Sequence, residues 1–346
     1  MADFHAFLEL TDSQRRTSGE AAELYQAYLE AVSQNRLFKG GMHWKKIRGR
    51  EYLYRYRDRY GHGGSLGPRS PQTEQVWGDF SRQRQALTAR LQGLRLRLAE
   101  QARFCRAALI HRIPTAMAKI LRRLEQHELE GNLLVIGTAA IYAYEFAAGV
   151  FLAGSGCREL LVNAGPSLTL SDNGPMSRDD LLRLLRRADR SFGLLEGEGC
   201  RAANRDGFLV QLLKSEARWP GRHKAITVPG AREPLPPEAG HLQYLTASPK
   251  LAQVVIGHDG LPATMVVPDP RAFALHHLWL SQQQDREEFK RTRDWRQALA
   301  VADLVLRYLP QYDFSSSELD MFPRDLVRDA EDGEGMTSIE EFQRQD

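Results

Sequence analysis

Residues 135–149 place the strongest constraint on what this chain can fold into. Their sequence, Val-Ile-Gly-Thr-Ala-Ala-Ile-Tyr-Ala-Tyr-Glu-Phe-Ala-Ala-Gly, predicts a buried strand, a turn at Gly137 and Thr138, and a helix that begins at once. A helix in this position can point its first backbone amides at a phosphate group. The surrounding apolar run, about 133–153, is interrupted by two glycines and a glutamate, so it lacks the continuous apolar length of a membrane span. We therefore expect a sheet with flanking helices and a candidate phosphate site at this turn.

The composition is typical of a globular chain. The 346 residues are 42% hydrophobic and 26% charged, which indicates about two domains. The three cysteines, Cys105, Cys157 and Cys200, are widely spaced and form no Cys-x-x-Cys pair, which argues against a disulfide framework and a structural zinc site. The first residues are acidic where a secretory signal would be basic and then apolar. We expect a cytoplasmic protein of bacterial type that does not enter a membrane.

The C-terminal segment, residues 313–346, carries a net charge opposite in sign to that of the rest of the chain. It holds 11 aspartates and glutamates against three arginines, a net charge of −8, whereas the whole chain carries +3, so residues 1–312 carry +11. This composition predicts a mostly disordered tail, which either aids solubility or screens the basic body of the same chain. Four apolar side chains in it are candidates for local packing: Phe314, Leu319, Met321 and Phe322.

Residues 42–68 predict a small antiparallel sheet with a basic surface. Aromatic and basic side chains alternate from Tyr52 to Arg57, as in a strand, and glycines mark the turns on either side. The alternation places Tyr52, Tyr54 and Tyr56 on one face. Two interpretations stay open, because these tyrosines either form the buried face of the sheet or are exposed and stack on the bases of RNA or DNA. The candidate contacts to nucleic-acid phosphates are Lys45, Lys46, Arg48, Arg50, Arg55 and Arg57.

Two helical regions flank this sheet in the sequence. Residues 7–36 have helical spacing, with apolar positions at Leu8, Leu24, Tyr28 and Val32. Residues 75–128 predict long helices interrupted at Pro114, with one buried stripe at Leu87, Leu91, Leu94 and Leu98. From position 82 to position 123 there are ten arginines and one lysine against a single acidic residue. This imbalance favours an anionic partner, either nucleic acid or the acidic tail, with a merely solvated face as the alternative.

From residue 132 onward the pattern becomes mixed α and β. We expect strands near 132–137, 159–163, 207–213, 253–257 and 264–267, and helices near 138–149, 177–188, 270–281 and 285–310. The expected division is an N-terminal helical region over 1–130 that contains the small sheet of 42–68, an α+β domain over 131–312, and the acidic tail over 313–346. Residues 214–240 contain five prolines and are expected to be a long loop over a site.

Several motifs resemble those of a bacterial family of nucleotidyltransferase-fold proteins, a distant branch of the DNA polymerase beta-like superfamily. The resemblance spans about 40 to 300. It is carried by Gly137-Thr138-Ala139-Ala140-Ile141-Tyr142-Ala143-Tyr144-Glu145, Arg187-Ala188-Asp189-Arg190-Ser191-Phe192, Asn204-Arg205-Asp206-Gly207-Phe208, Ile256-Gly257-His258-Asp259-Gly260-Leu261-Pro262, Val266-Val267-Pro268-Asp269-Pro270-Arg271, and Lys290-Arg291-Thr292-Arg293-Asp294.

The resemblance implies an α+β fold with a mixed sheet and flanking helices, NTP and Mg²⁺ as ligands, and transfer of a nucleoside monophosphate to an acceptor. In this superfamily two carboxylates at positions i and i+2 of one strand and a third from a neighbouring strand hold Mg²⁺, which bridges the attacking and leaving oxygens. Gly137 and Thr138 are then the residues that contact the triphosphate.

Residue by residue, the chain departs from this pattern. The resemblance places the first carboxylate position on Cys157, the second on Glu159 and the third on Gln211. Cysteine is a soft ligand that suits zinc better than magnesium, and the amide of Gln211 can neither neutralise a dication nor accept a proton from a hydroxyl. His277 stands where the family often has a lysine. Glu159 is therefore the remaining candidate as metal ligand and catalytic residue.

Three functional interpretations follow. The first is an active nucleotidyltransferase that uses Glu159 and a further acid, for which Glu145, Asp172 and Asp206 are candidates. The second is a pseudo-enzyme that retains the fold as a nucleotide-binding or regulatory module, so that transfer is weak or absent. The third is a nucleic-acid-binding protein whose basic N-terminal half contacts RNA or DNA.

Overall fold

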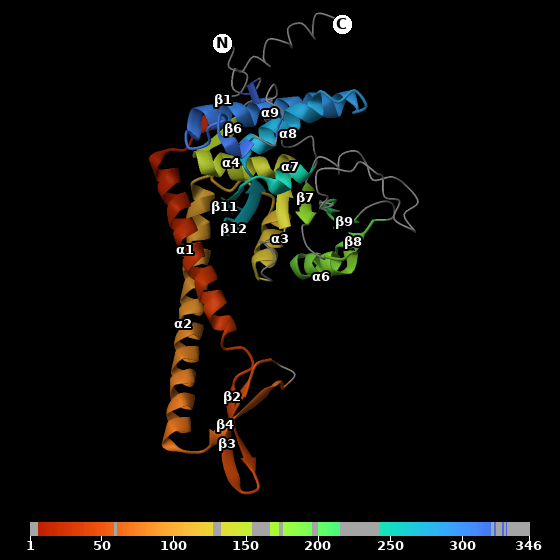
Figure 1. Ribbon diagram of the computed structural model, residues 1–346. Coiled ribbons are helices and arrows are strands. Elements are labelled where there is room, and N and C mark those ends of the chain that lie inside the picture. Colours follow the sequence, from red (N-terminus) through yellow and green to blue (C-terminus); the bar gives the residue numbers. More distant parts are fainter. Residues whose placement is uncertain are drawn as a thin grey trace, which may run out of the picture. The chain divides into compact units, whose positions relative to one another are not determined.

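The computed structural model describes residues 6–58, 61–126, 133–153, 167–172, 176–195, 200–214, 242–319, 322, 327–328 and 330. The chain divides into two compact units (Figure 1). Arg16–Ile110 form the N-terminal unit, and Met1–Arg15 together with His111–Asp346 form the C-terminal unit.

The N-terminal unit consists of two long helices and a three-stranded sheet. Helix α1 (Asp12–Arg36), most of which belongs to this unit, runs beside α2 (Pro71–Ala107), and the sheet lies where α1 ends and α2 begins (Figure 1). The sheet has the order β2-β3-β4 and is antiparallel throughout. Its strands are β2 (Met42–Ile47), β3 (Arg50–Tyr56) and β4 (Gly63–Pro68). The predicted small antiparallel sheet is confirmed.

The apolar stripe predicted on the second helix holds the two helices together. Leu91 and Leu94 are buried against Ala31 of α1, and the partly buried side chains around them are Leu24, Ala27, Tyr28 and Val32. Helix α2 begins at a capping box, in which Ser70 Oγ accepts from Thr73 N–H and Thr73 Oγ1 from Ser70 N–H. Burying leucines at i and i+3 on one face explains why an arginine-rich helix is stable here.

The first predicted helix begins later than its periodicity suggested. Residues Ala6–Glu9 form strand β1, which pairs antiparallel with β6 (Val150–Ala153). Helix α1 starts only at Asp12, where Thr11 Oγ1 accepts from Gln14 N–H at 3.3 Å. Leu8 is 60% exposed. The expected place of Leu8 on the helix is therefore wrong, because pairing with β6 holds this segment extended.

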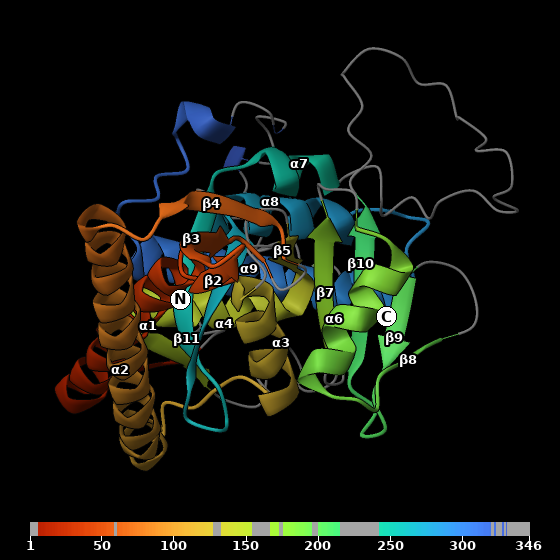
Figure 2. The same ribbon diagram turned by 90° about the horizontal axis from the view of Figure 1, so that it is seen from below.

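The C-terminal unit is built on a mixed sheet of five strands in the order β5-β7-β10-β9-β8. Its strands are β5 (Leu133–Ile136), β7 (Ser167–Asp172), β10 (Leu209–Lys214), β9 (Cys200–Ala203) and β8 (Gly193–Leu194). Strands β7 and β10 are parallel and lie side by side in Figure 2, whereas the other pairs are antiparallel. The buried apolar side chains of β7 and β10 are Leu168, Leu170, Val210 and Leu212.

A hairpin and several helices pack around this sheet. Strands β11 (Lys250–Ile256) and β12 (Pro262–Pro268) form the antiparallel hairpin. The helices are α3 (Thr115–Gln126), α4 (Ile141–Ala148), α6 (Arg178–Ala188), α7 (Leu242–Ala247), α8 (Pro270–Ser281) and α9 (Glu288–Tyr308), with the 3₁₀ turns η1 (Gly137–Ala140) and η3 (Ser317–Leu319). Helix α3 contacts α6 and β12, and α4 contacts β11 and α9. Helices α8 and α9 run alongside one another (Figure 1).

The predicted fold class, an α+β fold with a mixed sheet, flanking helices and a preceding small antiparallel sheet, is confirmed. Strand β7 was not predicted, and the strand expected near 159–163 lies outside the described residues. The loop expected over 214–240 lies almost wholly outside them as well. The division into 1–130, 131–312 and 313–346 stays a prediction, although α3 contacts elements of the C-terminal unit. Among the described helices, none combines the length and the apolar character that crossing a membrane requires.

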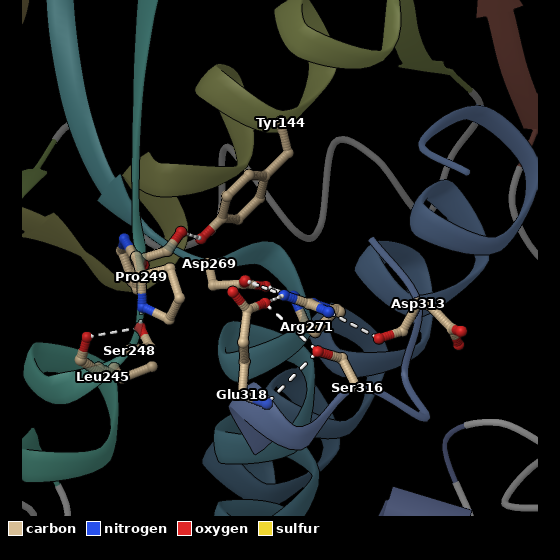
Figure 3. A network of polar contacts seen from close by, with 10 residues as sticks. Tyr144, Leu245, Ser248, Pro249, Asp269, Arg271, Asp313, Ser316 and Glu318 are labelled. Atoms are coloured by element: carbon tan, nitrogen blue, oxygen red, sulfur yellow. Dashed lines mark hydrogen bonds and ion pairs between the residues drawn. The ribbon is translucent and has the colours of Figure 1, made fainter. Parts of the chain in front are cut away.

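A buried arginine ties the start of the acidic segment to this unit (Figure 3). Arg271, only 3% exposed, pairs with Asp269 at 2.6 Å and with Glu318 at 2.6 Å, and donates to the carbonyl oxygen of Asp313 at 2.6 Å. Burial lowers the pKa of Arg271, but the hydrogen bonds to both carboxylates raise it above its ordinary value. The predicted local packing of the segment is confirmed for Phe314, Leu319 and Phe322, which are buried, whereas Met321 lies outside the described residues.

Candidate functional site

The turn after β5 has the predicted strand–glycine–helix form. Gly137 adopts φ +66°, a left-handed conformation that residues with a Cβ rarely take, and the 3₁₀ turn η1 leads directly into α4. The helix ends at Gly149, which is also left-handed at φ +67°. The chain therefore leaves the buried strand, turns sharply and presents Thr138 at the end of the sheet.

A pocket of about 260 Å³ opens at this turn. It collects residues from β5, η1, β7, β10, α7, α8 and α9. Among the side chains that line it are Thr138, Ser167, Thr169, Gln211, His276, His277, Arg286, Arg293, Asp294 and Gln297. The structure thus brings together Gly137, Thr138, Gln211 and His277, four of the residues that the sequence singled out, although they lie far apart in the chain.

The strand positions that line this pocket are uncharged. Gln211 of β10 lies directly beside Thr169 of β7 in the parallel register, and Thr169 also pairs with Ile136 at the end of β5. Ser167, two positions before Thr169, lines the same pocket. The strands hydrogen-bonded to β10 are β7 and β9, so the neighbours of Gln211 within the sheet come from these two strands. Cys157 and Glu159, the expected carboxylate positions, lie outside the described residues.

The carboxylate that lines the pocket, Asp294 on α9, is fully buried and engaged by cations. Its Oδ2 accepts from Arg286 Nε at 2.5 Å, and its Oδ1 lies 3.2 Å from His277 Nδ1 and 3.6 Å from Arg293 Nη2. Burial raises the pKa of Asp294, but the hydrogen bond and charge of His277 and the charge of Arg286 lower it below its ordinary value. Asp294 is therefore an anion that holds two arginines and a histidine in place.

The described lining residues do not fit Mg²⁺. This ion is bound by carboxylates and other oxygens that are free to approach it in octahedral geometry. Asp294 already accepts a hydrogen bond from Arg286, and a Mg²⁺ ion placed at this carboxylate would be repelled by Arg286 and Arg293. Within the described part of the chain, no group of three or more His, Cys, Asp or Glu residues is suited to hold a metal ion.

Two polar atoms in the pocket lack a partner among the described residues. Gln297 is fully buried, and its Nε2 donates to Thr138 Oγ1 at 2.7 Å, whereas its Oε1 has no hydrogen-bond donor there. Arg293 Nε is likewise buried without an acceptor. A buried polar group without a partner costs about 1–3 kcal/mol, a cost that a water or a ligand in the pocket would relieve. Gln297 Oε1 is a hydrogen-bond acceptor, and Arg293 Nε is a donor.

The acids considered as replacements for the missing carboxylates lie elsewhere. Glu145 is fully buried and paired with Arg112 at 2.6 Å, and it also accepts from Leu152 N–H at 2.8 Å. Burial raises its pKa although Arg112 opposes this shift. Asp172 lies at the opposite end of β7, beside Leu133 at the start of β5. Asp206 is exposed, and none of the three is among the residues that line the pocket.

Several of the resembling motifs have structural roles. Asp259 pairs with Arg122 at 2.5 Å and so joins the β11–β12 turn to α3. Asn204 Nδ2 donates to Asp189 Oδ2 at 3.0 Å, and Asn204 Oδ1 accepts from two backbone amides of its own turn. Asp269 caps α8 by accepting from Arg271 N–H at 2.8 Å. These side chains hold turns and helix ends, whereas Gly137, Thr138, Arg293 and Asp294 form the pocket.

One of the six basic residues expected to contact nucleic acid has another role. The Arg55 guanidinium donates to four backbone carbonyls, those of Leu37, Lys39, Gly41 and Tyr56, at 2.6 to 3.2 Å. Burial, together with the charges of Arg84 and Arg57, lowers its pKa. Arg55 therefore has a structural role in this segment through its two terminal nitrogens, and its expected place among the phosphate contacts stays a prediction. The other five, Lys45, Lys46, Arg48, Arg50 and Arg57, are exposed.

Sequence reasoning missed Ser167, Thr169, Arg286 and Gln297. The alternation Ser-Leu-Thr-Leu-Ser over 167–171 is a strand signal of period two, so β7 could have been found. Gln297 lies one helical turn after Arg293, which belongs to one of the motifs that resemble the family. The sequence therefore also allowed the prediction that these two residues share a helix face. Arg286 lies before the first turn of α9, and no sequence pattern marks it.

Comparison with known proteins bears on the C-terminal unit. A family model described as nucleotidyltransferase matches residues 115–322, which is more than half of the chain. The matched range begins with the first residue of α3 and contains all the residues that line the pocket. No curated protein and no solved structure matches the chain.

Proposed function

The chain belongs to a nucleotidyltransferase family, and from this premise we propose that it binds a nucleoside triphosphate with the phosphates held by cations of the protein. In this proposal carboxylate-bound Mg²⁺ is not required for binding. The observation that carries it is the composition of the pocket at Gly137. There, Arg286 and Arg293 surround an already neutralised Asp294, and uncharged Ser167, Thr169 and Gln211 occupy the neighbouring strand positions.

Each group has a role that follows from its chemistry. The turn at Gly137 exposes backbone amides of η1, and Thr138 contributes a hydroxyl that is positioned by Gln297. Arg293, whose Nε lacks an acceptor among the described residues, can donate to a phosphate oxygen. His277 occupies the position where the family often has a lysine. These donors suit a multiply charged anion, and the free carbonyl oxygen of Gln297 suits a ligand N–H or O–H.

Transfer of a nucleotidyl group is the competing function. In this superfamily it uses carboxylates that hold a metal and activate the acceptor. The carboxylate among the described pocket residues, Asp294, is instead held by Arg286 and lies beside His277. Glu159 is the remaining candidate for that role and lies outside the described residues. We therefore infer a nucleotide-binding member of the family with weak or absent transfer.

Isothermal titration of the full chain with ATP, GTP, CTP and UTP, in Mg²⁺ and in EDTA, tests the proposal. We expect at least one NTP to bind in EDTA with an affinity within about threefold of that in Mg²⁺. Arg293→Gln should weaken it about tenfold, as expected for a lost charge-assisted hydrogen bond. Lys290→Gln, which removes a charge of the same helix outside the pocket lining, should bind like the wild type.

Incubation with NTP labelled in the α-phosphate distinguishes the two functions. Under the proposal little or no label is transferred to the protein or to added RNA. Binding that requires Mg²⁺, together with transfer that Glu159→Gln abolishes, would overturn the proposal and establish an active transferase.

A further inference from the structure

The three-stranded sheet of the N-terminal unit has an unusual distribution of aromatic side chains. On β3, Leu53 is fully buried and points to the face that packs within the unit. Tyr52, Tyr54 and Tyr56 alternate with it and therefore lie on the opposite face, where all three remain partly exposed. Leu53 is therefore the buried residue of β3, and both interpretations of the tyrosines stay predictions, because these side chains are partly buried and partly exposed.

The partners on β2 extend the same face. In the antiparallel register Lys45 lies opposite Tyr52 and His43 opposite Tyr54, so their side chains share the face of the tyrosines. The rings of Tyr54 and Tyr56 stack with centroids 6.2 Å apart and planes at 24°. Lys45 Nζ lies 5.4 Å from the Tyr54 ring, and the His43 ring lies 6.0 Å from that of Tyr56. We call this set, His43, Lys45, Tyr52, Tyr54 and Tyr56, the tyrosine face.

Positive charge borders the tyrosine face, and the nearby acids are engaged. The exposed cations at the edge of this face are Arg48 on the β2–β3 turn and Arg50 at the start of β3, and Lys45 lies on the face itself. Strand alternation assigns Lys46 and Arg57 to the opposite face. Glu51 pairs with Arg69 at 2.6 Å, and Asp58 pairs with His62 at 2.5 Å. Because Lys45, Arg48 and Arg50 are exposed cations and strand alternation places Glu51 on the opposite face, the tyrosine face carries a net positive charge.

A groove adjoins the face along β2. It has a volume of about 690 Å³ and lies between β2 and α2. Its aromatic lining residues are His43, Trp44, Trp77 and Phe80, with Arg84 among the polar ones. Trp77 is 40% exposed. Because His43 belongs to both, ring faces continue from the tyrosine face over the edge strand into this groove.

We propose that the tyrosine face binds a single-stranded nucleic acid, with unpaired bases stacked on Tyr52, Tyr54 and Tyr56 and the backbone phosphates held by the bordering cations. Stacked, partly exposed rings on one face of a sheet match the planar faces of unpaired bases, and a positive surface matches the backbone. A duplex buries its base faces in its own stack and cannot use the rings. The site is separate from the NTP pocket, so this inference does not depend on the proposed function.

Fluorescence anisotropy of the full chain with labelled 12-nucleotide oligouridylate and oligothymidylate, and with a 20-base-pair duplex, tests this. Both single strands should bind more tightly than the duplex, and affinity should fall as salt rises from 50 to 300 mM. The ratio between the two single strands tells whether ribose or deoxyribose is preferred. No binding of either single strand at 50 mM salt would overturn the proposal.

Paired variants separate stacking from folding. Tyr52→Leu combined with Tyr54→Leu should weaken binding at least about tenfold, because stacking on each ring is lost. Tyr52→Phe with Tyr54→Phe keeps the rings and should bind like the wild type. Lys45→Gln with Arg50→Gln should weaken binding and reduce the salt dependence. Equal thermal unfolding of the leucine and phenylalanine pairs shows that the sheet is intact.

The arginine-rich helix supplies the matched charge control. Arg95→Gln with Arg97→Gln removes two exposed charges from α2 outside the sheet and should leave binding within about threefold of the wild type. If this variant loses binding while the leucine pair retains it, the helix is the binding surface and the assignment to the tyrosine face is overturned. The assignment to the tyrosine face is also overturned if the phenylalanine and leucine pairs bind the oligonucleotide with equal affinity.

Discussion

Gln297 Nε2 donates to Thr138 Oγ1 at 2.7 Å, which joins helix α9 to the turn that follows β5. The two residues are 159 positions apart in the chain. This hydrogen bond fixes the orientation of a fully buried amide, so that its oxygen is left for a ligand. The turn predicted from the sequence thus becomes part of a pocket only through a helix near the other end of the chain.

Thr138→Val should destabilise the protein, because it leaves the buried Gln297 amide without its acceptor. We expect a loss of about 1–3 kcal/mol in the free energy of unfolding, measured by urea denaturation. Thr264→Val is the matched control, since Thr264 Oγ1 is buried without a partner among the described residues. That substitution should leave stability unchanged or raise it. Equal losses in both variants would contradict the importance of the Thr138–Gln297 bond.

The Arg112–Glu145 pair should behave as a unit. Arg112→Met leaves a fully buried carboxylate without its cation and should cost about 3–5 kcal/mol. Glu145→Gln in the same background removes the buried charge while keeping an acceptor for Leu152 N–H, so it should recover much of that loss. Urea unfolding of the two single variants and the double variant measures the coupling. Additive losses would show that the two side chains do not interact, whatever their distance of 2.6 Å.

The carboxylate of Asp294 should make stability depend on pH. The pKa of Asp294 in the folded protein is lowered below the ordinary value of 3.8. The ionised carboxylate therefore adds to the free energy of unfolding above about pH 4, and this stabilisation is lost as pH falls through the folded pKa. Asp294→Asn should cost about 3 kcal/mol at pH 7 and progressively less below pH 4. Unfolding of both proteins in urea at pH 7, 5 and 3 provides the comparison. A difference that is constant over this range would be inconsistent with an ionised Asp294.

Arg55 should be irreplaceable by lysine in the N-terminal unit. An ammonium group has three donors on a single atom and cannot span the four carbonyls that the guanidinium reaches. Arg55→Lys should therefore lower the unfolding free energy by about 1–3 kcal/mol and speed amide exchange near Gly41. Arg57→Lys, at an exposed position of the same segment, should leave both measurements unchanged. Hydrogen exchange followed by mass spectrometry resolves the segment directly.

The parts of the fold that could be predicted are those set by local sequence. The apolar strand, Gly137 and the following helix are contiguous, and the leucine stripe of α2 repeats at helical spacing, so neighbouring residues carry the whole signal. Strand β7 was missed because its alternation of serine, leucine and threonine is weaker than the apolar run near residue 160. Its place between β5 and β10 depends on long-range pairing, which local pattern does not encode.

The candidate site was predictable only in part, for a related reason. Gly137, Thr138, Gln211 and His277 were identified, and the pocket contains all four. Arg286 and Gln297 enter it through the packing of α9, and the charge on Asp294 is controlled by neighbours that are not adjacent in the sequence. Similarly, the charge of Arg55 suggested a ligand contact, and no sequence pattern indicated that its side chain donates to four backbone carbonyls.

Asp294 has a further consequence for how the pocket could change in evolution. An internal anion keeps Arg286, Arg293 and His277 close together before any ligand arrives, so the site is preorganised and needs little rearrangement on binding. Under the proposed function the same anion competes with an incoming phosphate for Arg286 and Arg293. A substitution that removed it would strengthen the attraction for the ligand while it weakened the fold. Stability and affinity are therefore opposed at this single side chain, and the present residue is a compromise between them.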